Sequence, residues 1–151
     1  MPEGLRKSLS CGNVSDLDRV IILNSVDIEG FPHYALLSPF QIVADGDSAL
    51  LIAVYSGSTT VENIMRTGKA ALAIFMGGGS YYIKGEVTTA GIVQHGYNGA
   101  EEKVFRMSSL RVLHDKSEIA PVITDPRFLV NGVVERYSAT RRHLCSMALQ
   151  R

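Results

Sequence analysis

The stretch YALLSPFQIVADGDSALLIAVY, residues 34–55, decides the fold of this chain. An apolar run from Tyr34 to Val43 is followed by Asp45-Gly46, a dipeptide typical of tight β-hairpin turns. The run Leu50 to Tyr55 then has the length and composition of an antiparallel partner strand. This hairpin predicts an antiparallel meander and argues against a parallel sheet, whose strands need longer crossover connections.

Other segments outside this hairpin have the β-branched, aromatic and apolar composition of strands. These are Val20 to Val26, Ala70 to Met76, Tyr81 to Thr89 and Phe128 to Tyr137. Glycines stand where the chain must turn: Gly30 ends the turn that starts at Asp27, and 77–79 are all glycine. With the two strands of the hairpin, these segments predict six strands.

The helices between these strands are expected to be short. Thr59 stands three residues before Glu62, the spacing of a capping box, and Gly68 supplies a stop for that helix. Further helical segments are expected where side-chain caps, acidic starts or one-sided apolar patterns occur. They begin at Ser15 to Asp18, extend from Asn98 to about Asp115, and close the chain from Thr140 to Gln150.

Strands joined mostly by hairpin-length loops favour a small antiparallel barrel, because closure hides strand edges that otherwise aggregate. An open sandwich is the alternative. The length of 151 residues matches one domain with one core, so residues 1–151 are expected to form a single domain. The fold class predicted from the sequence is mainly β with short helices.

The composition argues against several classes of partner. Lys plus Arg and Asp plus Glu each number 15, with no run of like charge, so a nucleic-acid partner is not expected. Charged residues interrupt the apolar runs, and no membrane-spanning segment is expected. The first residues lack the apolar region of a secretory signal, which predicts a cytoplasmic protein.

The cysteines and histidines predict no local reactive or metal site. Cys11 and Cys145 are far apart in sequence and show no metal-ligand spacing, so each is interpreted as a structural thiol. The four histidines are scattered, and no metal site is expected. No combination of nucleophile and base is recognisable, so catalytic residues are unassigned and any chemistry would come from a cofactor.

Five fragments in order resemble the pyridoxamine 5′-phosphate oxidase-like flavin-binding split β-barrels. The fragments are VDIEGFPH at 26–33, the Asp45-Gly46 turn with LLIAV at 50–54, Asn63-Ile64, AALAI at 70–74 and YIKGE at 82–86. The resemblance covers about residues 20–89. It implies a six-stranded antiparallel split β-barrel that binds flavin mononucleotide (FMN) at the interface of a homodimer.

Carried onto this sequence, the resemblance implies a set of FMN-binding residues. The ring of the flavin would lie against Ala35, Leu36, Leu37 and Ser38. The phosphate would lie near Val54, Tyr55, Ser56, Ser58, Thr59, Thr60 and Asn63, with Lys84 as a further cofactor contact. A helix N-terminus with hydroxyl groups nearby is chemically suited to an anion.

Several of these residues have structural interpretations as well. Ser58, Thr59 and Thr60 would cap any helix that starts here, Tyr55 would pack, and Lys84 would be a solvated lysine. Relatives often carry Arg or Lys where this chain has Thr59 and Thr60, so Arg66, Lys69 or Lys84 would have to supply the positive charge.

Three hypotheses for function follow from the resemblance. The leading one is an FMN-dependent oxidoreductase acting on an unidentified small molecule. The second is a non-catalytic protein that binds flavin, haem or a deazaflavin on the same barrel, because a fold does not fix a function. The third is an interaction module without a cofactor.

Overall fold

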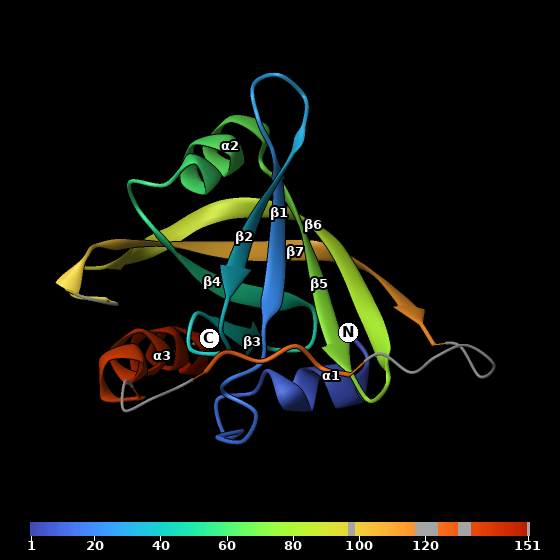
Figure 1. The fold of residues 1–151 in the computed structure, drawn as a ribbon. Coiled ribbons are helices and arrows are strands. Elements are labelled where there is room, and N and C mark those ends of the chain that lie inside the picture. Colours follow the sequence, from blue (N-terminus) through green and yellow to red (C-terminus); the bar gives the residue numbers. More distant parts are fainter. Residues whose placement is uncertain (97–98, 117–123, 130–133, 151) are drawn as a thin grey trace.

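The computed structural model describes residues 1–96, 99–116, 124–129 and 134–150. Within them, one antiparallel sheet has the strand order β2-β1-β5-β6-β7-β4-β3 (Figure 1). The strands are β1 Ile21–Val26, β2 Pro32–Leu37, β3 Ile42–Asp45, β4 Ala49–Tyr55, β5 Lys69–Met76, β6 Gly79–Val93 and β7 Glu102–Asp115. The helices are α1 Glu3–Ser8, α2 Thr59–Thr67 and α3 Val134–Leu149. The mainly β prediction with short helices is confirmed.

The two predicted hairpin turns form where the sequence places them. Gly46 has φ +68° between β3 and β4, a left-handed conformation that glycine adopts without a steric penalty. Between β1 and β2, Gly30 has φ +92°, and the Asp27 carboxylate accepts hydrogen bonds from the amides of Glu29 and Phe31. Local turn chemistry therefore sets both connections.

The prediction of one strand over Tyr34 to Val43 is wrong. The run divides into β2 and β3, which lie at opposite edges of the sheet and are joined by a turn at Ser38 to Gln41. Pro39 has no amide hydrogen to donate to a strand ladder, which favours a break at this position. The sheet consequently curls but stays open between β2 and β3.

The helix expected from Asn98 to Asp115 is also wrong over its described residues, since Glu102–Asp115 forms the long strand β7. β7 pairs with β6 on one side and with β4 on the other. The charges interpreted as helical serve this strand: Arg106 donates to the Asp45 carboxylate at 2.7 Å. The division of the Tyr34 to Val43 run and the formation of β7 add two strands, and the strand expected over Phe128 to Tyr137 is absent from the sheet, so the described residues form seven strands where six were predicted.

The ends of the chain differ from the prediction as well. The strand expected over Phe128 to Tyr137 is not formed in its described part: 134–137 belong to α3, and 130–133 lie outside the described residues. Helix α3 confirms the closing helix expected from Thr140 and starts earlier. No helix starts at Ser15 to Asp18, because Asp16 and Asp18 form ion pairs with Arg127 instead. Helix α1 was not predicted.

The sheet packs on both of its faces. Its inner face encloses the main core, which includes Leu23, Ile52, Leu72, Ile83 and Phe105, all at most 2% exposed. On the outer face, α3 covers part of β3 and β4 and buries a second cluster that includes Leu51, Ala53 and Leu144 (Figure 1). Strand β4 is buried on both faces for this reason, which explains its unbroken apolar sequence.

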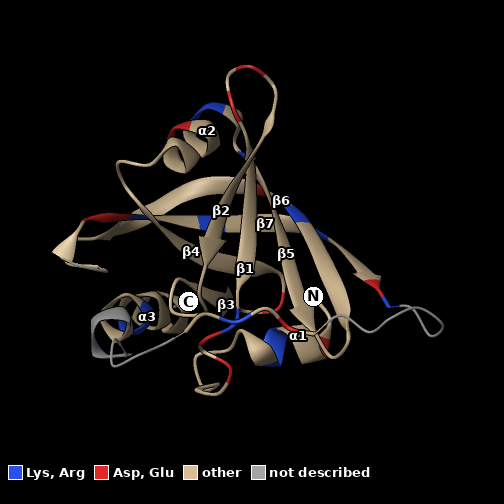
Figure 2. Cartoon of the chain, in the orientation of Figure 1, with Lys and Arg blue, Asp and Glu red and all other residues tan. Residues whose placement is uncertain are grey.

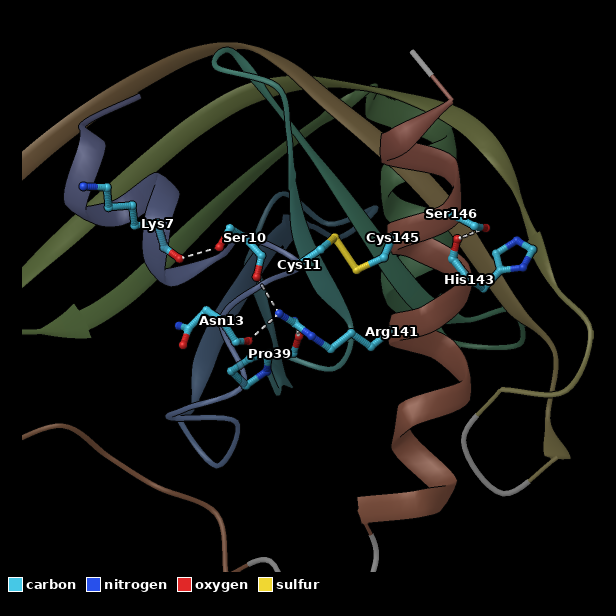
Figure 3. The surroundings of a disulfide bond; sticks show 9 residues. All are labelled: Lys7, Ser10, Cys11, Asn13, Pro39, Arg141, His143, Cys145 and Ser146. Atoms are coloured by element: carbon cyan, nitrogen blue, oxygen red, sulfur yellow. Dashed lines mark hydrogen bonds between the residues drawn. A yellow bond between two sulfur atoms is a disulfide. The ribbon is translucent and has the colours of Figure 1, made fainter.

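A disulfide and a buried arginine fix α3 to the N-terminal segment (Figure 3). Cys11 and Cys145 are bonded, with 5.7 Å between their Cα atoms, so the prediction of two separate thiols is wrong. Arg141 donates to the carbonyl oxygens of Pro39, Ser10 and Asn13, and burial lowers the pKa of its guanidinium. Disulfides persist mainly in oxidising compartments, so the cytoplasmic location stays a prediction without support from this bond.

Charges of both signs are spread along the chain, as Figure 2 shows. In the described part of the chain, no helix has the length and apolar character needed to cross a membrane. The same residues contain no group of three or more His, Cys, Asp or Glu side chains placed to hold a metal ion.

Candidate functional site

The open seam of the sheet lies between β2 and the β3–β4 hairpin, and most of the predicted site residues border it. Strand β2 pairs with β1 alone among the described strands, so its other edge carries free backbone groups. The turn at Ser38 to Gln41 crosses the seam. The Ala53 amide donates to the Gln41 carbonyl at 2.8 Å, and the backbone amide of Ser38 donates to the side-chain oxygen of Gln41 at 3.3 Å. We call this region the split.

The four residues expected beside the flavin ring, Ala35 to Ser38, differ in which of their groups are accessible at the split. Ala35 packs against the main core and Leu37 is buried in it, so only their backbone is available to a ligand. Leu36 points outward and is 60% exposed. Ser38 is buried, and its hydroxyl has no hydrogen-bond partner among the described residues. An unpartnered buried hydroxyl is unfavourable, which marks Ser38 as a group able to bind a polar ligand atom.

A second buried hydroxyl of this kind lies at the end of β4, on the other side of the split. Val54 is a core residue, whereas Ser56 has a buried hydroxyl that also lacks a hydrogen-bond partner in the described part of the chain. Tyr55 is 56% exposed, and its ring lies against Gly57, where a Cβ atom would approach the tyrosine hydroxyl to 3.0 Å. Gly57 therefore allows Tyr55 to fold back over the chain that leads into α2.

The N-terminus of α2 is capped by Ser58, whose hydroxyl accepts from the Val61 amide at 3.3 Å. The interpretation of Ser58 as a cap residue is confirmed, whereas the capping box expected to start at Thr59 is wrong, because the cap lies one residue earlier. Thr59 is exposed in the first turn, while Thr60 is 2% exposed and faces the protein interior. The predicted stop is confirmed, since Gly68 ends the helix with φ +63°.

Asn63 and Arg66 are engaged with β1. Asn63 is buried and donates to the Ser25 hydroxyl at 3.1 Å, and Arg66 donates to the Val26 carbonyl. These contacts dock α2 over the end of the barrel. Arg66 lies in the last turn of α2, so it does not bring its charge to the N-terminal end of that helix.

Lys84 lies in a different place, on the outer face of β6. Its cross-strand partner is Arg111 in β7, and both line a pocket of about 680 Å³ with Asn24, Tyr34 and Tyr82. The structure therefore separates Lys84 from the residues at the split. Sequence reasoning missed the other pocket residues, because only the strand register shows that they share one surface.

The split offers several hydrogen-bond donors and little positive charge. The hydroxyls of Ser38 and Ser56 and the first turn of α2 fit the oxygen atoms of a phosphate or a flavin ring. Of the three cations suggested to replace the family's basic residues, Arg66 binds a backbone carbonyl, Lys84 lies in the outer pocket and Lys69 follows the far end of α2. The residues present fit a flavin held mainly by neutral donors.

Solved structures with a similar fold identify the fold of this chain. HupZ of Group A Streptococcus matches with a TM-score of 0.55 and 16% identity, over 82% of this chain and 100% of that chain. A candidate pyridoxamine 5′-phosphate oxidase from Lactobacillus delbrueckii matches with a TM-score of 0.51 and 15% identity, over 62% of this chain and 82% of that chain. The chain has the pyridoxamine 5′-phosphate oxidase-like split-barrel fold. The resemblance seen in the sequence is thereby confirmed for the fold.

Two further comparisons bear on how far this likeness extends. An F420 reductase matches with a TM-score of 0.50 and 15% identity, over 74% of this chain and 98% of that chain. In sequence, the chain is 37% identical over 63 residues to the uncharacterized protein YclD of Bacillus subtilis (strain 168), which is 42% of this chain and 41% of that relative. No family model matches the sequence.

Proposed function

We propose that this protein binds FMN in the split, with the flavin ring along β2 and the phosphate toward the N-terminus of α2. The observation that carries the proposal is the pair of buried, unpartnered hydroxyls of Ser38 and Ser56 at the ends of the two bordering strands. The backbone edge of β2 and the first turn of α2 add further donors on either side. Likeness in fold to a candidate pyridoxamine 5′-phosphate oxidase supports the choice of ligand.

We propose that the protein with FMN bound is an oxidoreductase acting on a small molecule. The flavin would supply the electron or hydride transfer. The chain would hold the flavin ring along the edge of β2, shield one face of the ring and leave the other face open to a substrate. No side chain is assigned as a catalytic acid or base.

A second candidate is a non-catalytic binding protein for flavin, haem or a deazaflavin. The neutral pair Thr59 and Thr60 favours this alternative, because a phosphate is held more strongly by charged donors. The fold likeness to an F420 reductase makes a deazaflavin the first ligand to compare with FMN. Oxidation of a reduced nicotinamide by the flavin-loaded protein separates the two candidates.

We further propose that the protein works as a homodimer. The β1–β2 hairpin projects from the rest of the sheet (Figure 1), and several of its apolar residues are exposed. Ile28, Phe31 and Leu36 are 85%, 64% and 60% exposed. Exposed apolar side chains grouped in this way are typical of a contact surface.

Reconstitution with FMN, followed by removal of free flavin, tests the binding proposal. The purified complex should keep a flavin absorption spectrum. Ser38→Ala and Ser56→Ala should each weaken FMN binding while leaving stability nearly unchanged, because each removes a hydroxyl that has no partner. Ser25→Ala is the matched control: it removes the acceptor of Asn63, so stability should fall and FMN affinity should not. A protein that retains no flavin contradicts the proposal.

Light scattering tests the dimer. The expected mass is about twice the 16.4 kDa of the chain. Phe31→Asp combined with Leu36→Asp should give a monomer, and Leu149→Asp, at an exposed apolar residue of α3, should not. A monomeric wild-type protein contradicts this proposal.

A further inference from the structure

The outer face of the sheet carries a pocket that the flavin proposal does not use. Its volume of about 680 Å³ lies within the range of small-molecule sites, which is roughly 300–1,000 Å³. The pocket crosses five neighbouring strands, β2, β1, β5, β6 and β7. Helix α3 packs elsewhere, on β3, on β4 and on the ends of β6 and β7 near Gly91 and Glu102.

Strand register arranges the residues of this pocket in two rows. The first row runs Tyr34, Asn24, Ala71, Lys84 and Arg111, with each residue directly opposite the next on the neighbouring strand. The second row runs Ile22, Ala73, Tyr82 and Leu113 in the same way. One row is therefore mainly polar and the other mainly apolar.

The side chains in the middle of both rows are short, because the residue that β5 contributes to each row is an alanine. Ala71 and Ala73 form the floor, and larger side chains rise on either side, among them Tyr34 on β2 and Tyr82 on β6. A shallow trough between aromatic and aliphatic walls suits a flat, apolar molecule.

Two positive charges lie at one end of this trough. Lys84 and Arg111 are directly opposite each other in an antiparallel ladder, a position in which like charges repel. Within the described residues, neither side chain forms an ion pair or a hydrogen bond. An anion between the two side chains would remove this repulsion.

We propose that this pocket binds a planar organic anion, with its flat body over Ala71 and Ala73 and its carboxylate or phosphate between Lys84 and Arg111. Asn24 and Tyr34 stand at the opposite end of the polar row, where they can bind a polar substituent. This site does not depend on a flavin in the split, because the two sites share none of the side chains that carry the two arguments.

The probe for this site is 1-naphthyl phosphate, measured by calorimetry and by shifts of backbone amide signals in NMR spectra. We expect saturable binding, with shifts at Asn24, Tyr82, Lys84 and Arg111. The neutral analogue 1-naphthol should bind at least about tenfold more weakly, or about 1.4 kcal/mol. Absence of saturable binding, or equal binding of the two probes, overturns the proposal.

Two variants locate the binding on the protein. Lys84→Gln with Arg111→Gln should weaken the probe at least about tenfold, and Ala73→Phe should do so with both charges in place by filling the trough. Lys69→Gln with Arg142→Gln removes the same charge outside the pocket and is expected to bind like wild type. Thermal unfolding checks that each variant is folded. If the double pocket variant binds like wild type, the anion site is not here.

Discussion

The outer face of the sheet differs between its two halves. Over β3 and β4 the chain covers its own sheet with α3, buries Leu51 and Ala53, and fixes the cover with a disulfide and with Arg141. Over β1, β5, β6 and part of β7 it leaves the sheet open, with alanines in the middle and beside them Lys84 and Arg111, neither of which has an ion-pair partner among the described residues. The first half is held by a covalent bond and by buried contacts, and the second half, with the adjoining split, contains the two proposed ligand sites. Substitutions in the two halves should therefore have separable effects.

Loss of the disulfide should have the largest effect. Cys11→Ser with Cys145→Ser removes a link between residues 134 apart in sequence, which is expected to cost roughly 2–5 kcal/mol of unfolding free energy. Chemical denaturation of the variant and of the oxidised wild type measures this. Binding of 1-naphthyl phosphate by the folded variant should be unchanged. A large loss of probe affinity would show that the two halves are coupled.

Arg141 should have the next largest effect. Arg141→Met leaves three carbonyl oxygens without their donor, at an expected cost of about 1–3 kcal/mol. The exposed neighbour Arg142 provides the matched control, since Arg142→Met should change stability by less than about 0.5 kcal/mol. Because Arg141 also holds the Pro39 carbonyl beside Ser38, FMN affinity should fall as well in the first variant. Equal stability of the two variants would show that the contacts of Arg141 do not stabilise the fold.

The cap of α2 should have a smaller effect. Ser58→Ala removes the acceptor for the Val61 amide and should cost about 1 kcal/mol of unfolding free energy. Thr59→Ala, one residue later on the exposed side, should cost less. Thermal unfolding of both variants decides which residue is the cap. A greater loss from Thr59→Ala would support the position predicted from the sequence.

The sequence predicts those parts of the molecule that depend on local chemistry. Asp45-Gly46, Gly30 and Gly68 each need a particular backbone conformation, and each turn or helix end was found at its predicted place. Strand β7 could not be predicted in this way, because its alternating burial is produced by β4 and β6 on either side. The same holds for the Cys11–Cys145 bond, which requires α3 to pack beside the N-terminal segment.

The candidate sites also differ in how far local sequence predicts them. The order of fragments indicates the strands that border the split, and the resemblance implies Ser38, Ser56 and Ser58 as site residues from the sequence alone. The opposition of Lys84 and Arg111 depends on the register between β6 and β7, which includes a shift between Lys84 and Glu86. No property of either residue in the sequence indicates that pairing.

The most direct test of the flavin proposal is the affinity of FMN relative to riboflavin in wild type and in Thr59→Lys. Thr59 is chosen because it is exposed in the first turn of α2, whereas a lysine at Thr60 would be buried. FMN should bind wild type more tightly than riboflavin. Thr59→Lys should tighten FMN about fivefold, or about 1 kcal/mol, and leave riboflavin unchanged, with Thr59→Gln as the neutral control. If the lysine changes both ligands equally or neither, the phosphate does not lie at the N-terminus of α2.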